Sequence, residues 1–86
     1  MGSVAITYRI MPEDVSTDLK AIQEGIRKVV GPALKGMQVK DVAFGLRAIL
    51  ALALVDDASG AGEKLESGMS ALPGVASVEA IDVTLV

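Results

Sequence analysis

The chain has 86 residues, of which 51% are hydrophobic, two are aromatic and none is cysteine or histidine, and its formal net charge is −3. A chain of this length buries only about 60 to 65% of the surface that it exposes when unfolded, so we expect one small domain, residues 1–86, with an aliphatic core. The lack of cysteine excludes disulfides and thiolate metal sites, and an acidic chain with scattered Lys and Arg argues against direct nucleic-acid binding, which requires clustered basic side chains.

The first predicted element is a strand over residues 4–11, because apolar side chains recur there at every second position. These side chains are Val4, Ile6, Tyr8 and Ile10. The segment "PEDVSTD" then predicts a turn that leads into a helix. Ser16 or Thr17 is the candidate helix cap, with Asp18 favourably placed in the first turn.

An amphipathic helix is predicted next, because apolar residues recur at spacings of three and four and form one stripe. The stripe comprises Leu19, Ile22, Ile26, Val29 and Val30. Glycine accepts the left-handed backbone at a helix end, and proline disfavours helical geometry in the residue before it. We therefore expect the helix to end at Gly31-Pro32.

The sequence pattern in the middle of the chain does not settle the secondary structure. Residues 37–42 alternate imperfectly and predict a short edge strand, and the run "LRAILALAL", residues 46–54, follows. Its residues are good helix formers, whereas its length and its borders at Gly45 and Asp56 suit a strand buried on both faces. Periodicity leaves these two interpretations nearly even. Interrupted by Arg47, the run is too short to cross a bilayer, which takes about 20 apolar residues.

A second helix is predicted over residues 61–72, followed by a last strand in "GVASVEAIDVTLV", which is rich in β-branched residues. The apolar side of this helix is formed by Ala61, Leu65, Met69 and Leu72. If residues 46–54 form a strand, the element order is βαββαβ. That order predicts an α+β, ferredoxin-like sandwich: a four-stranded antiparallel sheet with two helices on one face.

Such a fold leaves the other face of the sheet without helices. The set Ile49, Ala51 and Ala53, or else the set Leu50, Leu52 and Leu54, must then lie on that open face. An open apolar patch usually marks an interface. We expect the face to be shielded by a partner or by self-association.

The sequence offers no complete catalytic motif. It has no histidine base or cysteine nucleophile, and no Gly-x-Ser-x-Gly, phosphate-binding loop or dinucleotide-binding glycine motif. The acid pairs Glu13-Asp14 and Asp56-Asp57 could bind a hard cation, but each falls where a strand meets a turn and is better explained as solvated charge. We therefore predict no enzyme and no catalytic, cofactor or metal site. The first residues lack the pattern of a signal peptide, so we expect a cytoplasmic protein.

Phe44 and Gly45 are the candidate binding residues. A lone phenylalanine is more often a core residue than a contact residue. The glycine beside it, however, either permits an unusual backbone angle or allows another chain to approach closely. A phenylalanine presented on such a bend is a candidate contact with a partner.

Three segments together resemble one family. The stretches "YRIMPED", "DVAFGLRAILALALVDD" and "LPGVASVEAIDV" are similar to archaeal translation elongation factor 1-beta over almost the whole chain. The resemblance implies a ferredoxin-like fold and promotion of GDP release, and so of GTP binding, on the GTPase elongation factor 1-alpha. It also implies that Phe44-Gly45 touches this GTPase near its nucleotide and magnesium site.

One departure from the family pattern and one alternative function accompany this interpretation. Eukaryotic members carry a lysine after the last strand that reaches toward the magnesium site, whereas "IDVTLV" has no basic residue. We assign that role to no residue and expect Phe44 and its surroundings to contribute more. The alternative is a ferredoxin-like domain that senses amino acids. An acylphosphatase-like enzyme is disfavoured, because "MPEDVSTD" is acidic where such an enzyme needs an arginine.

Overall fold

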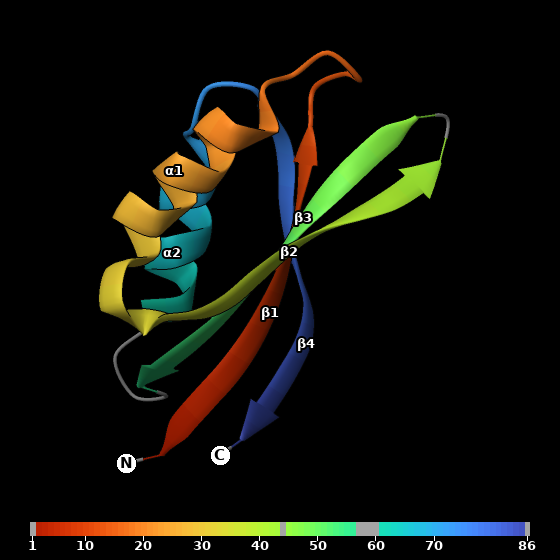
Figure 1. Cartoon of the computed structure of the whole chain (residues 1–86). Coiled ribbons are helices and arrows are strands. Elements are labelled where there is room, and N and C mark those ends of the chain that lie inside the picture. Colours follow the sequence, from red (N-terminus) through yellow and green to blue (C-terminus); the bar gives the residue numbers. More distant parts are fainter. Residues whose placement is uncertain (1, 44, 57–60, 86) are drawn as a thin grey trace.

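The fold is taken from a computed structural model, which describes residues 2–43, 45–56 and 61–85. The elements in chain order are strand β1 (Ser3–Pro12), helix α1 (Leu19–Val30), a short 3-10 helix η1 (Gly31–Ala33), strands β2 (Leu34–Ala43) and β3 (Leu46–Asp56), helix α2 (Ala61–Ser70) and strand β4 (Val75–Leu85). The four strands form one antiparallel sheet in the order β2-β3-β1-β4. Both helices lie on the same face of this sheet (Figure 1). The predicted ferredoxin-like α+β arrangement is confirmed.

The ambiguous hydrophobic run is a strand. As β3 it pairs with β1 on one side, from Ser3 opposite Asp56 to Ile10 opposite Ile49, and with β2 on the other. Ladder hydrogen bonds on both sides and a helix layer over one face outweigh the helix propensity of its leucines and alanines.

The boundaries of β2, α1 and α2 differ from the prediction; α2 ends at Ser70 rather than at residue 72. Strand β2 starts at Leu34, directly after the 3-10 turn, and spans 10 residues rather than only residues 37–42, because pairing with β3 extends past the imperfect alternation. The cap of α1 is Asp18, not Ser16 or Thr17: its carboxylate accepts hydrogen bonds from the backbone N–H groups of Lys20 at 3.0 Å and Ala21 at 3.3 Å. The predicted end of α1 at Gly31 is confirmed, with φ at +63°.

The core lies between the helices and the covered face of the sheet. Alternate residues of β1 and β3 and one stripe of α1 are buried there with one residue of α2. These are Val4, Ile6, Tyr8, Ile10, Ile49, Ala51, Ala53, Val55, Ile22, Ile26, Val30 and Met69. The other residues that we expected to face inward, Leu19, Val29, Leu65 and Leu72, are half-buried and pack against this cluster. The side chain of Ala61 lies outside the described part of the chain.

Helix α2 is held by close packing, which offsets the low helix propensity of its glycines. A Cβ atom at Gly68 would lie 2.7 Å from Cγ1 of Val29 on α1, so only glycine fits there without a shift. At the start of α2, the hydroxyl of Tyr8 donates a 2.8 Å hydrogen bond to the carbonyl of Gly62. Burial, and secondarily the nearby Glu66 carboxylate, raise the pKa of Tyr8. Within the described ranges, no helix is long and apolar enough to cross a membrane.

Candidate partner-binding site

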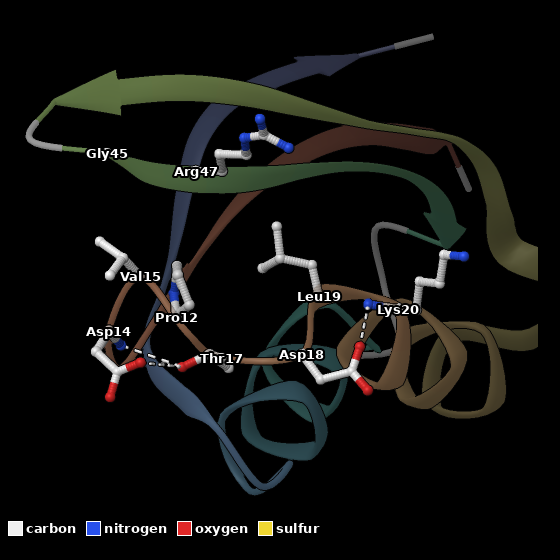
Figure 2. A pocket seen from close by; sticks show the side chains of 9 residues that line it. All are labelled: Pro12, Asp14, Val15, Thr17, Asp18, Leu19, Lys20, Gly45 and Arg47. Atoms are coloured by element: carbon white, nitrogen blue, oxygen red, sulfur yellow. Dashed lines mark hydrogen bonds between the residues drawn. The ribbon is translucent and has the colours of Figure 1, made fainter.

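The β1–α1 loop and the β2–β3 turn meet at one end of the sheet. Figure 1 places both at the end opposite the start of β1 and the end of β4. A shallow pocket of about 470 Å³ lies between them (Figure 2). We call its lining the tip surface, which comprises Pro12, Asp14, Val15, Thr17, Asp18, Leu19, Lys20, Gly45 and Arg47.

Asp14 organises the loop side of the tip surface. Its Oδ1 accepts hydrogen bonds from the backbone N–H of Ser16 at 2.8 Å, from the Ser16 hydroxyl at 2.7 Å and from the Thr17 hydroxyl at 3.3 Å. The hydroxyl of Ser16 is the main reason that the pKa of Asp14 lies below its usual range. At the base of the loop, the Glu13 N–H donates to the carbonyl of Gly74 at 2.9 Å. Ser16 and Thr17, predicted as helix caps, therefore shape the loop instead.

Val15 is the apolar centre of the tip surface. Val15 is 66% exposed, although it lies among polar and charged neighbours. Figure 2 shows Leu19 pointing from the start of α1 toward the β2–β3 hairpin, on the same side of the loop. An exposed valine on a loop that its own hydrogen bonds hold in shape is available to a partner at little cost in conformational entropy.

The glycine predicted as a binding residue lines the same pocket. Gly45 is exposed and has φ at +81°, a left-handed conformation that side chains rarely adopt. A Cβ atom there would lie 3.6 Å from Cγ1 of Val15, which is ordinary contact. The unusual backbone angle therefore accounts for this glycine within the domain, where Val15 does not crowd it. Phe44, its predicted companion, lies outside the described residues.

Charges of both signs surround the apolar centre. Arg47 Nε lies 3.1 Å from Asp41 Oδ1, and both side chains are largely exposed. Lys20 reaches outward from the first turn of α1 (Figure 2). The described ranges contain no cluster of three or more acidic side chains that could hold a metal ion. Of the two acid pairs, Glu13-Asp14 contributes Asp14 to the loop bonds above, and Asp57 lies outside the described residues.

The sequence alone did not reveal Val15, Lys20 or Arg47 as site residues. Val15 carries one local signal, an apolar residue inside the acidic turn "PEDVSTD". Its proximity to Gly45 arises only when the loop and the hairpin fold to the same end of the sheet. An exposed apolar side chain ringed by charges of both signs has the arrangement of an apolar centre and a polar rim that protein-binding domains use.

Comparison with known proteins identifies the family. Residues 5–86 match the family model described as the EF-1 guanine nucleotide exchange domain. The chain is 39% identical over 85 residues to elongation factor 1-beta of Methanoregula boonei, covering 99% of both chains. It is 40% identical over 85 residues to elongation factor 1-beta of Methanococcoides burtonii, covering 96% of both. The match to elongation factor 1-beta of Archaeoglobus fulgidus is 36% over 90 residues, covering 99% of both.

The chain therefore belongs to the EF-1 guanine nucleotide exchange family, and its function is guanine nucleotide exchange in translation elongation. The resemblance inferred from the three sequence segments is confirmed. Nothing in these comparisons supports the alternative of an amino-acid-sensing domain.

Proposed function

We propose that residues 1–86 act as one cytoplasmic exchange domain that binds elongation factor 1-alpha through the tip surface. The domain works by protein binding rather than as an enzyme, and it does not contact nucleic acid directly. The observation that carries the proposal is the exposed Val15 beside the left-handed Gly45, in a chain of the exchange family. Phe44 and Gly45 are the proposed partner-binding residues, together with Val15.

Exchange by this route needs no nucleophile, acid or base. A factor that binds the nucleotide-free GTPase more tightly than the GDP-bound form must, by thermodynamic reciprocity, weaken GDP binding by the same factor. GDP then leaves faster, and GTP fills the site. The tip surface supplies what this mechanism requires, an apolar contact on a loop whose shape is set by the Asp14 hydrogen bonds.

Phe44 is the proposed aromatic anchor. Gly45, the next residue, has a left-handed backbone, a conformation that glycine adopts in tight turns. An aromatic anchor at the centre of an interface commonly contributes about 2 kcal/mol, roughly a 30-fold change in affinity. A buried core phenylalanine would instead contribute about 3 to 5 kcal/mol to folding.

Binding of nucleotide-free elongation factor 1-alpha, measured by titration calorimetry, tests the proposal. We expect Phe44→Ala to weaken binding about 30-fold and Val15→Asp to weaken it about tenfold, both with a nearly unchanged thermal midpoint. Val83→Asp is the matched control, because Val83 is 60% exposed but lies opposite Ile6 on β4, away from the tip. If Val15→Asp and Phe44→Ala bind as tightly as the parent chain, the GTPase docks elsewhere.

A further inference from the structure

The sheet face opposite the helices carries the larger side chains of β3. Ile49, Ala51 and Ala53 are buried against the helix layer, so Leu50, Leu52 and Leu54 project to the open face. Leu52 is 38% exposed and Leu50 and Leu54 are half-buried. Of the two sets that the sequence left open, the leucine set therefore lies on the open face.

Small residues of the neighbouring strands lie beside Leu52 and Leu54. Ala5 and Thr7 of β1 are the direct partners of Leu54 and Leu52, and Gly36 of β2 is opposite Leu52. With no side chain at Gly36, the face is hollowed beside the leucines, in a depression of about 330 Å³. Arg9 and Gln38 flank Leu50, so the apolar part of the face centres on Leu52 and Leu54. Exposed apolar surface of this kind on a sheet is typical of a surface that another sheet covers.

The two edges of the open face carry opposite charge. Lys40 on β2 is paired with Ala48, which shares the face of Leu50 by strand alternation. On β4, Glu79 lies opposite Arg9 and Asp82 lies opposite Thr7, both on the open face. The Glu79 carboxylate bonds Arg9 at 3.0 Å, yet its side chain remains 60% exposed.

A second copy of the chain would cover the exposed leucines and would also pair the oppositely charged edges. A two-fold axis parallel to the strands, above the middle of the face, places β2 of one copy over β4 of the other, because the strand order is β2-β3-β1-β4. Lys40 of each copy then faces the acidic edge of the other, close to Glu79, while the leucine rows meet in the middle. Such an interface is isologous and closes at two copies, so it does not propagate into a fibre.

We propose that two copies of this chain associate face to face through the open sheet face. Leu52 lies at the centre of the interface, and Lys40 of each copy pairs with Glu79 of the other. The tip surface stays free, because it lies at the end of the sheet between the β1–α1 loop and the hairpin turn (Figure 2). The association goes beyond the exchange function and stands or fails independently of it.

Sedimentation equilibrium of the purified chain over a range of concentrations tests this proposal. We expect the average mass to rise from monomer to dimer with concentration, and no higher. Leu52→Glu should abolish the rise, and Lys40→Glu should weaken it. Lys40→Gln, which removes the charge without reversing it, should weaken it less than Lys40→Glu. Val83→Glu changes an exposed apolar position on the other face; it is the control and should associate like the parent chain.

Circular dichroism first establishes that each variant is folded, and Lys40→Glu is an exposed change that leaves the core untouched. A parent chain that stays monomeric at the highest concentration overturns the proposal, as does a folded Leu52→Glu chain that still dimerises. If the parent chain is monomeric and Leu52→Glu slows GDP release, the face belongs to the GTPase interface instead, which also overturns it.

Discussion

Replacing Gly45 by alanine separates the geometry of the hairpin turn from the stability of the domain. Gly45 has a φ angle of +81°, so an alanine there would have to adopt the left-handed conformation, which costs an L-residue about 1 to 2 kcal/mol. Crowding adds little, because among the described residues the alanine Cβ would meet only Val15 Cγ1, at 3.6 Å. A domain of this size loses about 4 to 8 °C of thermal midpoint per kcal/mol, so Gly45→Ala should melt between about 4 and 16 °C lower.

Gly31→Ala provides the matched control for this change. Gly31 also has a left-handed φ, +63°, and a Cβ atom there would meet no atom of the described part of the chain within 4 Å. It ends α1 and is therefore remote from the turn. Both variants should lose stability by differential scanning calorimetry, but only Gly45→Ala should slow GDP release from elongation factor 1-alpha. Equal exchange rates for the two variants would refute the idea that the turn geometry belongs to the binding site.

Two further predictions concern the elements that hold the fold. Asp18→Ala removes both capping hydrogen bonds of α1 and should lower the free energy of unfolding in urea by about 1 kcal/mol, whereas Asp18→Asn, which keeps an acceptor, should lose less; equal losses would contradict the capping role. Tyr8→Phe removes the hydrogen bond to Gly62 and should cost about 1 kcal/mol. Because the pKa of Tyr8 is raised in the folded chain, its stabilising effect is complete below its unfolded pKa of about 10 and is lost as pH rises through the folded pKa. Urea unfolding from neutral to strongly alkaline pH should show this loss in the parent chain and less of it in Tyr8→Phe.

Most of the fold could be predicted from the spacing of apolar residues. They alternate in strands that have one solvent-exposed face, and they form a stripe along helices that have one solvent-exposed side. The exception was the run at residues 46–54, where every residue except Arg47 is apolar and no period is visible. Its state is decided by pairing with two strands that are distant in the sequence. The same lack of contrast hid which face of β3 meets the helices. The register that sets Ile49 opposite Ile10 decides it, and that register cannot be read from either strand alone.

The helix start was hard to predict because several nearby polar residues compete for the capping role. The tip surface was hard to predict because its residues are distant from one another in the sequence. Ser16, Thr17 and Asp18 are all good capping residues, and Asp14 engages the first two, which leaves Asp18 as the cap. The resemblance to the exchange family pointed to Phe44 and Gly45. It did not point to Val15, because the β1–α1 loop reaches Gly45 only in the folded domain.

The central claim, that this domain releases GDP from its GTPase, has a direct test. Purified elongation factor 1-alpha is loaded with fluorescent GDP, and the release rate is measured in excess GTP, with this protein at amounts well below one per GTPase. The account predicts a release rate that rises with the amount of added protein and a reaction that runs to completion, because each molecule of the factor acts repeatedly. A release rate equal to that of the GTPase alone, at every concentration of folded protein, would contradict it.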